Sequence, residues 1–80
     1  MKKESVENYI YEVCEILRER ALDAKKKAAS EDDKSKDFDE GVLMGFYCAI
    51  SILKNQAPFF DITHEELGLA DFDPDVDLLS

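Results

Sequence analysis

The fold of this chain is decided by residues 41–53, which read GVLMGFYCAISIL. Just before them, Asp37 and Glu40 have the spacing of a capping box, which predicts the start of a helix. Pro58 disfavours helical conformation at the residue before it, so the helix is expected to end near Gln56 or Ala57. At about 100° per residue, only a narrow strip of this helix is polar. A surface helix needs one apolar stripe, so this helix must be covered on more than one side.

The apolar circumference divides into two faces that differ in side-chain size. The small face consists of Gly41, Gly45, Cys48 and Ala49, with Ile52 beside them. The bulky face consists of Val42, Leu43, Phe46, Ile50 and Leu53. Which of the two faces meets another helix therefore becomes the central question about the fold.

A first helix is predicted over residues 5–29, because apolar residues recur there at spacings of three and four. The connection at residues 30–36 is short and contains no apolar side chain, so the two helices are expected to fold back as an antiparallel hairpin. This register brings small side chains of the two helices together and predicts close backbone approach. The expected helix-packing residues are Ala24, Ala28, Gly41, Gly45 and Ala49.

In that arrangement the bulky face of the second helix still needs a cover. One candidate is a second copy of the chain, which gives a homodimer with a four-helix arrangement. The other is the C-terminal segment, docking within one chain or across a dimer. Its candidate docking residues are Phe59, Phe60, Ile62, Leu67, Leu69 and Phe72.

The C-terminal segment begins with a second capping box, Thr63 to Glu66, which predicts a short third helix that Gly68 ends. The remaining residues, 69–80, alternate aspartate with apolar side chains and predict an acidic arm without helix caps. The predicted fold class is therefore all-α. Residues 1–80 are expected to form one small domain, with the helical hairpin at 1–57 and the short helix and acidic-apolar tail at 58–80.

The net charge is −9, and it is unevenly distributed. Residues 1–36 carry nine basic and nine acidic side chains, whereas residues 37–80 carry ten acidic side chains and one basic side chain, Lys54. This distribution argues against nucleic acid as a partner, since phosphate binding needs Lys and Arg on one face. It permits a basic protein partner, which would be attracted from a distance. The alternative is that the acidic surface only keeps the protein soluble.

The sequence shows neither a signal peptide pattern nor a membrane-spanning run, because the apolar stretch is shorter than the roughly 20 residues that a bilayer requires. A cytoplasmic protein without membrane association is therefore expected. The two cysteines, Cys14 and Cys48, lie on apolar stripes and are predicted to be reduced and buried.

Side chains that could support catalysis are sparse. The chain has one histidine, so neither a Ser-His-Asp nor a Cys-His arrangement is supported, and no glycine-rich phosphate loop is present. The alternating aspartates 71, 73, 75 and 77 lack the glycine that an EF-hand loop needs at its sixth position. No enzyme activity and no cofactor are predicted.

The sequence thus favours a non-enzymatic acidic helical protein, a small regulator, inhibitor or immunity-type binder of a more basic protein. The alternative is a small metal-binding or metal-dependent helical protein. Its candidate ligands are Asp61, His64, Glu65 and Glu66.

Overall fold

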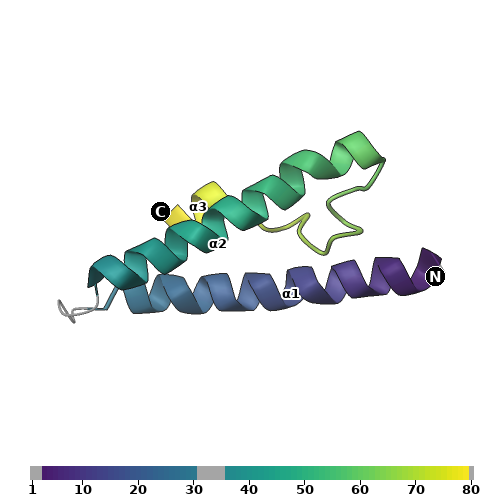
Figure 1. Ribbon diagram of the computed structural model, residues 1–80. Coiled ribbons are helices and arrows are strands. Elements are labelled where there is room, and N and C mark those ends of the chain that lie inside the picture. The colour runs from purple at the N-terminus through teal and green to yellow at the C-terminus, as the bar shows by residue number, and fades with distance from the viewer. Residues whose placement is uncertain (1–2, 31–35, 80) are drawn as a thin grey trace.

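The computed structural model describes residues 3–30 and 36–79, and Figure 1 shows its helices. Helix α1 spans Lys3–Ala28, α2 spans Lys36–Gln56, the 3₁₀ helix η1 spans Ala57–Phe60, and α3 spans Pro74–Leu79. The described residues contain no β-strand. The prediction of an all-helical hairpin is confirmed. A short third helix is also present, but it lies at Pro74–Leu79 and not at residues 63–68, where it was predicted. The connection expected at 30–36 lies largely outside the described residues.

The two long helices run in opposite directions and pack against each other (Figure 1). They lie close together near the connection and separate toward the other end, where the chain after η1 fills the space between them. Short α3 returns to pack on both long helices. None of the described helices is long and apolar enough to cross a bilayer.

The buried core joins the hairpin to the C-terminal segment. Its members come from all three parts of the chain and are Cys14, Ala21, Ile50, Ala57, Leu67, Leu69, Phe72 and Leu78. Half of them belong to residues 67–78. The C-terminal segment is therefore an integral layer of the core, and it covers the hairpin within a single chain.

The orientation of α2 differs from the prediction. Its bulky face is turned inward: Ile50 is fully buried, and Leu43, Phe46 and Leu53 pack partly buried against the core. At the edge of this face, Val42 is exposed. The chain itself therefore covers most of the bulky face, which is not left over as a whole for a second copy.

The predicted close approach of small residues is wrong. Ala24 is buried, Ala28 and Ala49 are half-buried, and both glycines are exposed. A Cβ atom placed on Gly41 or Gly45 would meet no neighbouring atom within 4 Å. The physical reason is that burying a large apolar side chain contributes about 1.5–3 kcal/mol, whereas turning glycine inward contributes almost no apolar area.

The prediction of two buried thiols holds for one of them. Both cysteines are free, and Cys14 is buried while Cys48 is exposed on the outward face of α2. Burial raises the pKa of the Cys14 thiol, because the apolar core disfavours the thiolate.

The second capping box forms as predicted, but it opens only one helical turn. The Thr63 hydroxyl accepts from the Glu66 backbone N–H at 3.1 Å, and the Glu66 carboxylate accepts from the Thr63 backbone N–H at 3.0 Å. Gly68 ends the turn with a φ of 73°, and bonds from Gly68 N–H to Glu65 O and from Leu69 N–H to His64 O complete a Schellman motif.

The arm expected without helix caps is in fact capped and helical. Asp73 precedes α3 and accepts a hydrogen bond from the Asp75 backbone N–H at 3.0 Å, and Pro74 occupies the first helical position. The Asp77 carboxylate accepts from the Asp73 backbone N–H at 2.8 Å. Two of the alternating aspartates therefore cap the helix rather than extend the chain.

Candidate functional site

The predicted docking residues divide into two groups. Leu67, Leu69 and Phe72 are buried in the core, and Ile62 is half-buried against it. Phe59 and Phe60 differ from the prediction, because their side chains are 79% and 70% exposed. They lie in η1, which continues α2 where the two long helices have separated.

Cationic side chains hold the C-terminal segment on the hairpin. Lys54 donates a hydrogen bond from its ammonium group to the carbonyl oxygen of Phe72, and Lys25 donates one to the carbonyl oxygen of Asp77 at 2.9 Å. The Arg18 guanidinium lies 5.2 Å from the centre of the Phe72 ring, within the range of a cation–π interaction. The Tyr47 hydroxyl donates to the Asp75 carboxylate.

The chain reverses direction at residues 58–64, where a side chain caps a backbone carbonyl at the end of α2. Pro58 has no N–H group, so it cannot donate to the Lys54 carbonyl four residues earlier. His64 Nε2 lies 2.7 Å from that carbonyl oxygen and, because a carbonyl only accepts, Nε2 carries the proton. Asp61 then turns the chain with a φ of 58°. The single histidine therefore has a structural task at this reversal.

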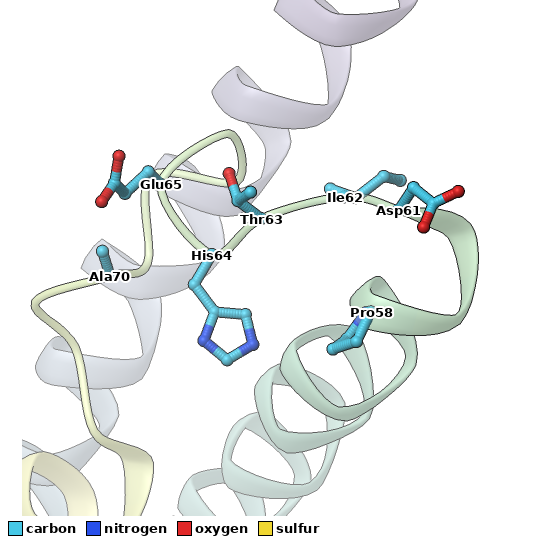
Figure 2. Close-up of a pocket in the computed structure, with 7 residues that line it drawn as sticks. All are labelled: Pro58, Asp61, Ile62, Thr63, His64, Glu65 and Ala70. Carbon is cyan, nitrogen blue, oxygen red and sulfur yellow. The ribbon is translucent and has the colours of Figure 1, made fainter.

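Two hollows flank the reversal, on either side of Asp61 and Ile62. Figure 2 shows the larger one, about 600 Å³, which is lined by Pro58, Asp61, Ile62, Thr63, His64, Glu65 and Ala70. The smaller one, about 330 Å³, is lined by Val6, Glu7, Ile10, Phe60, Asp61, Ile62, Glu66 and Leu67. The second hollow joins the start of α1 to the chain after η1, so it exists only in the folded protein.

The electrostatics of this end of the molecule are one-sided. Both hollows are lined by apolar side chains and by carboxylates, and no lysine or arginine is among the described residues that line them. Lys54, the one basic residue of positions 37–80, is engaged with the Phe72 carbonyl. We call this region the end surface, and it consists of Val6, Glu7, Ile10, Phe59, Phe60, Asp61, Ile62, Glu65 and Glu66.

The candidate metal ligands are not brought together as a set. Figure 2 shows the carboxylates of Asp61 and Glu65 pointing away from the His64 ring. The Glu66 carboxylate accepts hydrogen bonds from Thr63. Within residues 3–30 and 36–79, no group of three or more His, Cys, Asp or Glu side chains could hold a metal ion. The arrangement offers binding surface rather than a coordination sphere.

Sequence reasoning missed the contribution of α1 to this surface. Val6, Glu7 and Ile10 reach it only because the chain after η1 folds back between the long helices. The apolar pair Phe59-Phe60 after Pro58 was the available signal, and it was interpreted as core rather than surface.

Comparison with models of known protein families found no match, and neither the curated proteins nor the solved structures gave a similar chain.

Proposed function

We propose that this protein is a non-enzymatic acidic interaction protein, a small regulator or inhibitor that binds a basic and apolar segment of a protein partner at the end surface. The observation that supports this proposal most strongly is the lining of the two hollows, which combines apolar side chains and carboxylates and has no lysine or arginine among the described residues. An exposed aromatic pair, Phe59 and Phe60, belongs to the same end surface.

The two parts of the surface have different physical roles. Apolar side chains of a partner that fill the smaller hollow, against Ile10, Ile62 and Leu67, supply affinity by removing apolar area from water. Carboxylates of the end surface that pair with Lys or Arg of a partner contribute about 0–1 kcal/mol each. Their larger effect is on the association rate, because the acidic field of the molecule attracts a basic partner from a distance.

The direct test is a titration of the ¹⁵N-labelled protein followed by NMR. The probe is an amphipathic helical peptide of lysine and leucine. A lysine-serine peptide tests charge alone, and a glutamate-leucine peptide tests apolar surface alone. We expect only the lysine-leucine peptide to bind strongly, with shifts centred on Asp61, Ile62 and Leu67, and we expect added salt to weaken it.

Two phenylalanines provide a matched pair of variants. Phe60 and Phe38 are exposed to nearly the same extent, 70% and 73%, and they lie near opposite ends of α2. Phe60→Ser should weaken peptide binding at least tenfold, while Phe38→Ser should leave it unchanged. Equal binding by both variants, or shifts centred away from the end surface, would overturn the proposal.

A further inference from the structure

One part of the exposed side of α2 is apolar and carries no charged residue. We call it the open face, and it consists of Phe38, Gly41, Val42, Gly45, Ala49 and Ile52. At about 100° per residue these positions share one side of the helix. Phe38 is 73% exposed and Ile52 is 61% exposed, so large apolar groups stand in water at both ends of the face. Such a contiguous apolar surface is typical of an interface.

The open face continues onto α1 as a groove. A hollow of about 270 Å³ is lined by Leu17 of α1 together with Val42, Gly45, Phe46 and Ala49 of α2. The C-terminal segment packs against the opposite side of α2, through Lys54 and Tyr47. The chain itself therefore covers one side of the hairpin and leaves the other side uncovered.

We infer that a second copy of this chain covers the open face, with the two α2 helices antiparallel about a twofold axis that passes beside Gly45. The pattern of side-chain sizes is symmetric about that residue. Phe38 and Ile52 both lie seven positions from Gly45, and Gly41 and Ala49 both lie four positions from it. The axis therefore sets Phe38 against the partner's Ile52 and Gly41 against the partner's Ala49.

This symmetry is what an interface between identical copies requires, because the same patch must complement itself. Small residues at the centre permit close approach of the helices, and a Cβ on Gly41 or Gly45 has no neighbour within 4 Å in the single chain. The large side chains at the two ends close the interface around them. A face with no charged residue gives a basic partner nothing to recognise, so this surface and the end surface select different partners.

The open face runs along most of α2. Phe38 and Ile52 lie 14 residues apart, which is about 21 Å at the helical rise. The acidic groups add a distinctive property: each copy carries a charge of −9, so the two copies repel, and screening by salt should strengthen the dimer.

Sedimentation equilibrium of the full chain, at low and high salt, tests the inference. We expect the mass of two chains at the higher concentrations and a smaller dissociation constant in high salt. Gly45→Leu should raise the dissociation constant at least tenfold without lowering the melting temperature of the monomer, because leucine is the better helix former and the space around Gly45 is free. Glu40→Leu, at an exposed position of α2 outside the open face, is the matched control and should leave the dimer intact.

Crosslinking provides an independent measurement of the axis. In a Cys48→Ser background, Gly45→Cys places two thiols beside the proposed axis and should give a covalent dimer under mild oxidation. Glu40→Cys in the same background should stay monomeric. Equal crosslinking of the two variants would overturn the proposed axis.

The remaining outcomes are equally decisive. A chain that sediments as a monomer at every concentration and salt level overturns the inference. So does a dimer that Phe60→Ser disrupts while Gly45→Leu and Phe38→Ser do not, because that dimer uses the end surface. Since peptide binding at the end surface is weakened by salt and the dimer is strengthened by it, failure of one proposal is distinguishable from failure of the other.

Discussion

The two faces of α2 have opposite environments although both are apolar. The bulky face, centred on Ile50, packs against α1 and residues 67–78, whereas most of the face centred on Gly45 is exposed. Side-chain volume therefore decides which face of a two-faced helix turns inward. Each large side chain that is buried removes far more apolar area from water than a glycine or an alanine does.

The largest effect is expected from removing a large side chain on the covered side. Phe72 is 2% exposed and fills the core beneath Arg18, so Phe72→Ala should lower the free energy of unfolding by about 3–5 kcal/mol. Phe60→Ala, at an exposed position, should change it by less than about 0.5 kcal/mol. Urea unfolding followed by circular dichroism measures both. Equal losses for the two variants would contradict the assignment of Phe72 to the core.

Replacing each of two glycines with alanine should change the stability of the protein in opposite directions. At Gly68 the φ of 73° and a Cβ that would lie 2.8 Å from the Tyr11 ring both oppose a side chain, so Gly68→Ala should destabilise the protein by about 1–2 kcal/mol or more. At Gly45, inside a helix with open space around it, Gly45→Ala should stabilise the monomer by up to about 1 kcal/mol. Thermal unfolding at low concentration compares them, and effects of the same sign would argue against the orientation of α2.

The chain reversal at the end surface gives a smaller effect with a built-in rescue. His64→Ala leaves the Lys54 carbonyl without its donor and should cost about 1 kcal/mol. Pro58→Ala restores a backbone N–H that can reach the same carbonyl. The double variant should therefore be more stable than the sum of the two single losses predicts. Strict additivity in a double-mutant cycle would show that His64 does not replace the missing donor.

The smallest effect is a pH dependence at the contact between α2 and α3. The hydrogen bond from the Tyr47 hydroxyl to the Asp75 carboxylate raises the pKa of Tyr47, because the phenolate cannot donate. This stabilisation is fully present below the ordinary tyrosine pKa of about 10 and is lost as the pH rises through the higher pKa of the folded protein. Unfolding free energies measured across this range should fall less for Tyr47→Phe than for the unchanged chain. Identical pH profiles would show that the contact does not form in solution.

The long helices could be predicted from the sequence because their signals are local. Apolar residues at spacings of three and four locate α1, and Pro58 locates the end of α2, within a residue or two. The capping box at Thr63 and the αL position of Gly68 were equally local, and both are present.

The elements that sequence reasoning missed depend on tertiary packing or on competing local signals. A helix that is apolar on most sides gives no indication of which side meets its neighbour, so the predicted rotation of α2 about its own axis was wrong. For the same reason, Cys48 was wrongly expected to be buried. The Asp73-Pro74 pair is a good start signal for a helix, but the alternating aspartates were given more weight. The end surface combines the start of α1 with residues 58–66, and no local pattern connects them.

The central claim is that residues 67–78 cover the bulky face of α2 within the same chain. An isotope-filtered NOE experiment on a mixture of ¹³C-labelled and unlabelled protein tests it most directly. NOEs are expected between the Phe72 ring and the Arg18 side chain inside one labelled chain, since the guanidinium carbon lies 5.2 Å from the ring centre, and none are expected between labelled and unlabelled chains. NOEs that appear only between chains, or no NOEs at all, would contradict it.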